Sequence, residues 1–254
     1  MHQLARLVPF ALLATMWGHP AQAGAIRVTP VRVEVPAGRQ FCALTVGNDA
    51  ERPVTVQVRG FAWTRDENGS DTLDAGNAPV VNPAIVTIPK GESRLVRCSL
   101  PRDTTGGAAE QQWRLIVDEL PQPSSEVAPG SVQTLLRLSV PVFRTPDKAT
   151  PQLGWSVVRT GDGTPALRIT NSGARRVQVV KVVMHLRSGQ DAPLNRGFYL
   201  LAKGAMVLPV RPDIAHDLAS VTADTDIGTM SLAPAVRAEG APDGKLDLSQ
   251  TAKQ

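Results

Sequence analysis

Long hydrophobic runs are scarce in this chain of 254 residues. After residue 23, no stretch approaches the roughly 18 to 20 uninterrupted apolar residues that a membrane-spanning helix needs. The beginning differs, because Met1–Ala23 combines an arginine, an apolar run and the small-residue pattern Ala21-Gln22-Ala23. This order predicts a secretory signal peptide over residues 1–23, cleaved after Ala23. We therefore expect the mature chain to be exported and soluble, without an integral membrane segment.

Residues that carry metal or catalytic chemistry are also few. Of the four histidines, His2 and His19 fall in the signal segment, which leaves His185 and His216 for the mature chain. Two histidines without metal-ligand spacing are too few for a zinc or copper site. The chain has no Gly-x-Ser-x-Gly, Gly-x-Gly-x-x-Gly, phosphate-loop or His-Glu-x-x-His motif. These absences predict a protein that is not an enzyme and that holds no metal and no cofactor.

Strong charge and numerous cysteines are missing too. The formal net charge is only +4, which is mild for nucleic-acid binding with its clustered basic residues, so we expect no nucleic-acid partner. Cys42 and Cys98 are the only cysteines, and both stand in strand-like runs. An even number in an exported chain favours a disulfide. Two buried reduced thiols are the alternative.

Turn-forming residues are abundant, with 21 glycines and 21 prolines between short segments rich in β-branched residues. This pattern is typical of many short strands, and the length after the signal allows two domains with separate cores. Prolines and polar residues at 144–151 predict a linker. We therefore predict an all-β protein with two immunoglobulin-like sandwiches, at residues 24–145 and 146–237, and a disordered tail at 238–254.

Alternation of apolar and polar residues gives the expected strands. In the first domain they lie at residues 31–35, 41–46, 54–63, 85–88, 93–100, 112–120 and 132–143. In the second domain they lie at residues 153–158, 166–170, 177–186, 197–201 and 205–210.

The segment Val132–Phe143 ends the first domain with an unusually long apolar row. Its even positions are Val132, Thr134, Leu136, Leu138, Val140 and Val142, whereas its odd positions are mixed. Such a row either completes the core of its own domain or is offered to a partner as an added strand. A second feature is Arg32, which interrupts the apolar edge Val31–Val35. Without further information, the simplest interpretation is that Arg32 is a solvent-exposed charge on an edge strand, where it discourages aggregation.

The order of these motifs resembles that of the periplasmic chaperones of the chaperone-usher pilus pathway, the PapD-like family. The resemblance runs from Val31 to about Gly228. It is carried by Val31-Arg32-Val33, Pro36-Ala37-Gly38, Leu44-Thr45-Val46-Gly47-Asn48, Pro53 through Gln57 to Trp63, Val81-Asn82-Pro83, Ile88-Pro89-Lys90-Gly91, Leu95-Val96-Arg97, Trp113-Arg114-Leu115, Asp118-Glu119-Leu120-Pro121 and Pro141-Val142-Phe143-Arg144.

The resemblance implies a periplasmic chaperone shaped like a boomerang, with pilus subunits and an outer-membrane usher as partners. It would lend the last strand of its first domain to an unfolded subunit, and main-chain hydrogen bonds and alternate side chains would hold the subunit. We expect Val132, Thr134, Leu136 and Leu138 to be lent, while Val140 and Val142 stay in the core. Self-association of the free chain would hide the same strand.

The family also implies two groups of charges. A basic pair, an arginine on the first strand and a lysine on the donor strand, anchors the carboxylate of the subunit. Arg32 matches the arginine, but Val140 stands where the lysine is expected, so Arg137 is our candidate, with Arg114 or Arg97 as alternatives. Glu119, Arg144 and Asp226 match an interdomain charge cluster, although a solvated surface charge also explains Asp226.

Two details concern the branch of the family. The missing lysine and the Pro141-Val142-Phe143 ending are more similar to the archaic branch, which serves subunits of the spore-coat-protein-U type. The short connection Leu120–Ser131 resembles that of the branch that serves rod-shaped pili.

Two other classes of protein remain open. One is a pilus subunit or adhesin with the same fold, which would carry its own donor extension. The other is a sandwich enzyme of the superoxide dismutase kind, which would need more histidines.

Overall fold

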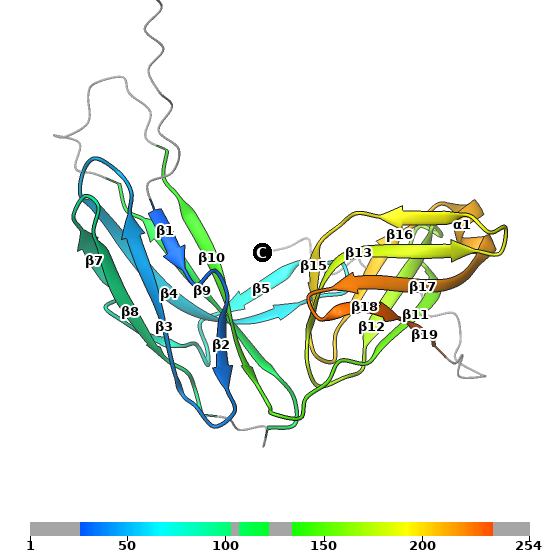
Figure 1. The fold of residues 1–254 in the computed structure, drawn as a ribbon, viewed down its shortest axis with the longest axis horizontal. Helices are drawn as coiled ribbons and strands as arrows, with labels where there is room; N and C mark the ends of the chain where they lie inside the picture. Colours follow the sequence, from blue (N-terminus) through cyan, green and yellow to red (C-terminus); the bar gives the residue numbers. More distant parts are fainter. Residues whose placement is uncertain (1–25, 103–106, 122–133, 236–254) are drawn as a thin grey trace, which may run out of the picture.

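The computed structural model describes residues 26–102, 107–121 and 134–235. They form two β-sandwich domains that meet at an angle, so the molecule is bent around an open side (Figure 1). The predicted signal at 1–23, the tail at 238–254 and Val132 lie outside the described residues. Within the described part, no helix is long and apolar enough to span a membrane.

The first domain contains two sheets. One has the order β1 (Ile26–Thr29), β3 (Phe41–Asn48), β8 (Ser93–Ser99) and β6 (Val80–Asn82). The other has the order β2 (Val33–Pro36), β10 (Arg137–Thr145), β9 (Gln111–Glu119), β4 (Val54–Arg65) and β5 (Asp71–Asp74), and β7 (Ile85–Ile88) also pairs with β4. The segment 26–36 therefore contributes to both sheets, because β1 pairs with β3 and β2 pairs with β10.

The second domain repeats the two-sheet plan. One sheet has the order β16 (Ala205–Pro209), β12 (Pro165–Asn171), β11 (Leu153–Arg159) and β19 (Ala233–Pro234). The other has the order β14 (Asp191–Leu194), β13 (Val177–Leu186), β17 (Leu218–Thr225) and β18 (Gly228–Ser231), with β15 (Phe198–Leu200) on β13. A short helix, α1 (Pro212–Asp217), precedes β17.

Alternation places one face of each strand in a core. On β9, Trp113, Leu115 and Val117 point into the first sandwich, where they meet Val56 and Val58 of β4. Burial of an aliphatic side chain of this size stabilises the fold by about 1.5 to 3 kcal/mol. The strand period of two thus sets the two sheets face to face.

Cys42 and Cys98 lie directly opposite each other on β3 and β8, and they form a disulfide. Their Cα atoms are 4.9 Å apart, within the usual range for a disulfide. The bond joins neighbouring strands of one sheet and lies against the buried core of the first domain.

Several strands differ from the sequence prediction. The predicted set omitted β17, which is the main partner of β13, because small and polar residues leave it only three buried side chains. It also omitted β5 and β14, whose residues are exposed or half-buried and which are held by backbone pairing at sheet edges. Periodicity reports burial, so strands that bury little are missed.

Candidate functional site

The edge of β10 is only partly covered. β10 pairs antiparallel with β9 over its length from Arg137 to Arg144, but it pairs with β2 only from Val142 to Thr145. Among the described residues, no strand pairs with the other edge of the stretch from Arg137 to Pro141. In Figure 1 this part of β10 borders the open side between the domains. Its free backbone groups can accept an added strand.

The apolar row, which begins before β10 and continues along it, passes gradually from exposed to buried. Thr134 is exposed, and Leu136 and Leu138 are half-buried against the core of the first domain. Val140 and Val142 are completely enclosed in that core. The two leucines therefore keep apolar surface available beside the open edge, while the two valines belong to the core of the first domain.

Arg32 lies just before β2, next to this edge. Its Nε is 2.9 Å from Glu34 Oε1, and its Nη1 donates to Asp226 Oδ2 at 3.1 Å and to Gln178 Oε1 at 3.2 Å. Burial alone would lower the pKa of Arg32, but hydrogen bonding with Tyr199 and the charges of Glu34 and Asp226 raise it. Arg32 is thus a permanent cation already surrounded by acceptors of both domains.

Arg114 lies near Tyr199 as well, as does Arg65, which donates to the Tyr199 carbonyl at 3.3 Å. Arg114 projects from β9 over the ring of Trp63, with the guanidinium carbon 3.7 Å from the ring centroid. Its side chain is only 11% exposed, and its nearest acid is Asp71 at 3.6 Å. Burial lowers the pKa of Arg114, and the charge of Asp71 opposes this shift. Trp63, Phe143 and Tyr199 pack together beneath it with ring centroids 5.6 to 5.9 Å apart.

Arg137, the predicted second anchor, lies elsewhere. It pairs with Asp118, and its side chain is 69% exposed. Since Val33 is opposite Val142, the position of Arg32 corresponds to Pro141, about 13 Å along the strand from Arg137 at 3.3 Å per residue. Arg97 is exposed on β8, in the other sheet. The structure therefore brings Arg114, and neither Arg137 nor Arg97, toward Arg32.

The predicted cluster of Glu119, Arg144 and Asp226 is wrong, because the three residues lie in three places. Arg144 is opposite Gln111 at the beginning of β9, and Glu119 is eight residues further, about 26 Å along the strand. Glu119 accepts a hydrogen bond from the Leu136 amide, while Asp226 pairs with Arg32.

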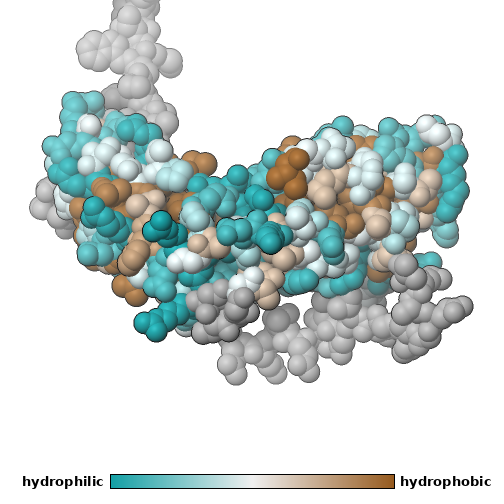
Figure 2. Space-filling model, turned by 60° about the horizontal axis from the view of Figure 1, so that its bottom comes forward, coloured by the Kyte–Doolittle hydropathy of each residue, from teal (hydrophilic) through white to brown (hydrophobic). Residues whose placement is uncertain are grey.

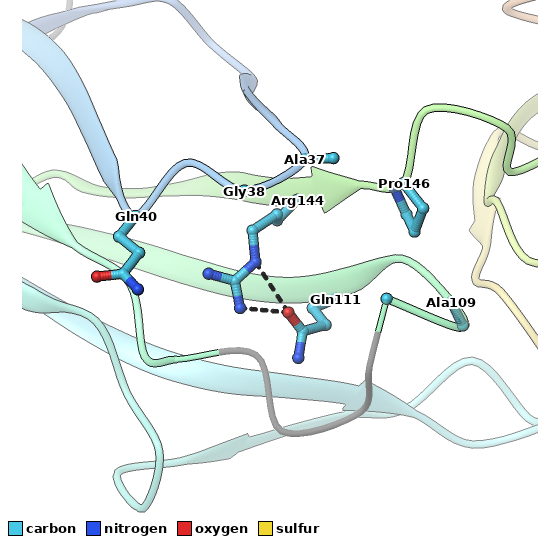
Figure 3. A pocket seen from close by; sticks show the side chains of 8 residues that line it. Ala37, Gly38, Gln40, Ala109, Gln111, Arg144 and Pro146 are labelled. Carbon is cyan, nitrogen blue, oxygen red and sulfur yellow. Dashed lines mark hydrogen bonds between the residues drawn. The ribbon is translucent and has the colours of Figure 1, made fainter.

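Arg144 is buried within the first domain. It donates to Gln111 Oε1 at 2.9 Å and to the Pro101 carbonyl at 2.9 Å. It lines a cavity of about 150 Å³ together with Gly38, Gln40 and Ala109, and Figure 3 shows its guanidinium group beside Gln111. In the described part of the chain, its hydrogen-bond partners are neutral groups of the first domain, which hold the linker end of β10.

A different ion pair joins the domains. Arg176 of the second domain donates to Glu110 Oε2 of the first at 2.6 Å, and both side chains are almost completely buried, at 2% and 1% exposure. Arg176 also pairs with Glu34 and stacks 3.4 Å from the centroid of Phe143. Glu110 accepts a further bond from Thr145 Oγ1 at 2.6 Å. These residues were not among the predicted site residues.

The β4–β5 hairpin makes a further interdomain contact. Glu67, in the turn between the two strands, forms a two-fold ion pair with Arg168 of β12, one bond of which is 2.8 Å long. The Glu67 carbonyl also accepts a 2.6 Å bond from the amide of Val207 on β16. Arg168 lowers the pKa of Glu67 by hydrogen bonding, although partial burial opposes the shift. The hairpin thus bridges the two domains, as Figure 1 shows for β5.

The outline of the molecule dips between the two domains. In Figure 2, a hydrophobic patch stands at the second-domain edge of this dip, with hydrophilic surface beside it. Exposed apolar residues next to charged ones are typical of partner-binding surfaces.

Comparisons with known proteins agree on one group. The family profile "Pili and flagellar-assembly chaperone, PapD N-terminal domain" matches residues 25–150. A search of curated protein sequences found no match. The fold is similar to a solved chain of the CsuC-CsuE chaperone-tip adhesion subunit pre-assembly complex from archaic chaperone-usher Csu pili of Acinetobacter baumannii, with TM-score 0.67, 20% identity, and coverage of 84% of this chain and 100% of that one.

Two further structures show the same fold. The Salmonella enterica SafA pilin in complex with the SafB chaperone gives TM-score 0.58 at 16% identity, with 84% of this chain and 97% of that chain covered. The class 5 fimbriae chaperone CfaA gives TM-score 0.57 at 12% identity, with 83% and 99% covered. The two-sandwich architecture therefore recurs over the full length of these proteins.

Proposed function

Since this chain belongs to the PapD-like family of pilus-assembly chaperones, we propose that it captures pilus subunits by donating β10 to them. The observation that carries the proposal is the open edge of β10 from Arg137 to Pro141, with half-buried leucines beside it. A subunit strand added there gains main-chain hydrogen bonds along the edge. Leu136 and Leu138, with Thr134 and Val132 before them, would enter the subunit's groove.

The carboxylate at the end of the subunit would bind at Arg32 and Arg114. Both guanidinium groups lie near Tyr199, on the side of the first domain that faces the second. Charge-assisted hydrogen bonds to a carboxylate are about twice as strong as neutral ones. The anchor sets where the subunit chain ends, and β10 then sets the register of its last strand.

The wider role follows from the family. The chaperone would act in the periplasm, keep subunits folded without ATP, and deliver them to an outer-membrane usher. The similarity to a chain from archaic Csu pili, together with Val140 in place of a lysine, supports the archaic branch. A role as a pilus subunit is less favoured, because β10 already completes the second sheet of the first domain.

Co-expression with the pilus subunits of the source bacterium tests this proposal. We expect the wild-type chain to co-purify from periplasm with a subunit that mass spectrometry identifies. Arg32→Ala and Arg114→Ala should each lower recovery of that subunit about tenfold, the loss of about 1.4 kcal/mol of binding. Arg159→Ala, an exposed arginine of the second domain, is the matched control. Normal recovery with both anchor variants would contradict the carboxylate role.

A further inference from the structure

Arg32 is already bound to a carboxylate in the structure. Asp226 reaches across from the turn between β17 and β18 of the second domain, and its Oδ2 accepts a 3.1 Å hydrogen bond from Arg32 Nη1. Its other oxygen, Oδ1, accepts a 2.9 Å bond from the backbone amide of Gln178. Asp226 therefore presents Arg32 with the same chemical group that a chain terminus would present.

We propose that Asp226 is an internal competitor that occupies Arg32 until the carboxylate of a partner displaces it. The inference rests on the proposed function, because it concerns what the anchor of that function binds when no partner is present. It makes Asp226 a residue that sets the selectivity of the anchor: a ligand must outcompete a carboxylate held in place by the fold. A weakly bound anion or a side chain within a partner's chain would not displace Asp226 from Arg32.

The position of the pair supports displacement. The side chains of Arg32 and Asp226 remain 33% and 24% exposed, so an incoming carboxylate can reach them. The residues next to them in sequence, Val31 and Ile227, are apolar and 78% and 50% exposed. A partner that replaced Asp226 at Arg32 would have apolar surface to cover on both domains.

Arg32 keeps other interactions when Asp226 leaves. Its Nε remains paired with Glu34, and Glu34 in turn pairs with the buried Arg176. The exchange thus opens one link between the domains while the Arg176–Glu110 pair still joins them. Displacement would change the local contact without separating the two sandwiches.

The test uses a peptide of alternating threonine and valine ending in phenylalanine, as the free acid and as the C-terminal amide, in calorimetric titrations of the full mature chain. Asp226→Asn keeps an oxygen for the Gln178 amide but removes the charge. We expect it to bind the acid about two- to fivefold more tightly, the upper part of the range of an exposed ion pair, and to bind the amide unchanged. Asp224→Asn, whose carboxylate bonds to Thr229 instead, should change neither.

Four outcomes would contradict the proposal. Equal acid affinity in Asp226→Asn and wild type, while Arg32→Ala removes the preference for acid over amide, would overturn the competitor and leave the anchor intact. An unchanged preference in Arg32→Ala would overturn the anchor itself. A gain in Asp224→Asn equal to that in Asp226→Asn would show a general charge effect, which also contradicts the proposal, as would no acid binding by any of these proteins.

Discussion

At the scale of single residues, the joint between the domains depends on a charge pair removed from water. Arg176 and Glu110 bury both charges, and Glu34, Thr145 and the backbone amide of Arg176 bond to them, while the Nε of Arg176 is buried without a hydrogen-bond partner among the described residues. Removing one partner of such a pair leaves the other charge buried without compensation, which is far more costly than losing a surface ion pair.

Replacing Arg176 by methionine should therefore destabilise the protein. We expect the free energy of unfolding to fall by about 3 to 5 kcal/mol, because Glu110 remains buried without its cation. Urea denaturation of Arg176→Met measures this loss, with the neighbouring Arg175→Met as control. A loss below about 1 kcal/mol, the size of a surface pair, would contradict the assignment.

The sequence singles out Arg32, whose role as a carboxylate anchor stays a prediction, but it predicts the wrong acid for the contact between the domains. Glu110 and Glu119 stand at opposite ends of β9, and either could be assigned to the linker side if the strand register is unknown. The antiparallel order of β9 and β10 settles it, since the end of β10 must lie beside the beginning of β9. Arg176 gave no signal, because nothing in the pattern around it distinguishes a buried arginine from an exposed one.

At the scale of elements, the two halves of β10 differ in burial and in the role that we propose for them. Leu138 is half-buried beside the open edge, whereas Val140 is enclosed by the core. The burial along this strand agrees with the expectation that Val140 and Val142 stay in the core, while the donation of the residues before them stays a prediction. The row itself showed only that one face is apolar, because the register with β2, which ends the open edge at Val142, depends on contacts distant in sequence.

Polar substitutions should separate the two halves. We expect Leu138→Asn to lower recovery of the co-purified subunit severalfold with a small change in stability. Val140→Asn should lower the free energy of unfolding by about 2 to 5 kcal/mol, because it buries an amide in an apolar core. Subunit recovery and urea denaturation of both variants measure the two effects. Equal stability losses would show that the strand is not divided in this way.

The β4–β5 hairpin predicts a pH dependence. Hydrogen bonding by Arg168 holds the pKa of Glu67 below its ordinary value of 4.5. The contribution of this pair to stability is thus complete above that value and is lost as pH falls through the lower folded-state pKa.

Thermal unfolding of wild type and Glu67→Gln across pH 3 to 7 measures this dependence. The wild type should have the higher melting temperature above about pH 5, and the two curves should converge in acid. If the difference in melting temperature stayed constant down to pH 3, the stability contributed by the Glu67–Arg168 pair would not depend on the protonation of Glu67, which would contradict this prediction. Asp213→Asn, which removes an exposed carboxylate paired with Arg211, serves as the control.

At the scale of the whole molecule, the bent arrangement places the open edge of β10 beside the second domain. Composition and alternation were sufficient to predict two β sandwiches, since burial on one face of each strand leaves a readable period. They could not predict how the sandwiches are joined. That depends on the Glu67 turn and the Arg176–Glu110 pair, which connect residues about 100 and 66 positions apart.

An open strand edge also has a consequence for the free protein. Unpaired edges with apolar side chains tend to find another strand, so the chain without a subunit should self-associate weakly. Sedimentation velocity over a range of concentrations should show reversible dimers, which disappear once a subunit is bound. Leu138→Asn should weaken this association, whereas a strictly monomeric free chain would show that the edge is protected in another way.

The claim that β10 is lent to a subunit is tested most directly by hydrogen exchange. Among residues 134–140, the amides that point to the open edge and away from β9 should exchange rapidly in the free chain, because no described strand bonds to them there. In the purified one-to-one complex with the co-purified subunit, the same amides should slow by at least tenfold, while those of β3 and β8 on the other sheet remain unchanged. Unaltered exchange of these open-edge amides in a stable complex would contradict donation of this strand.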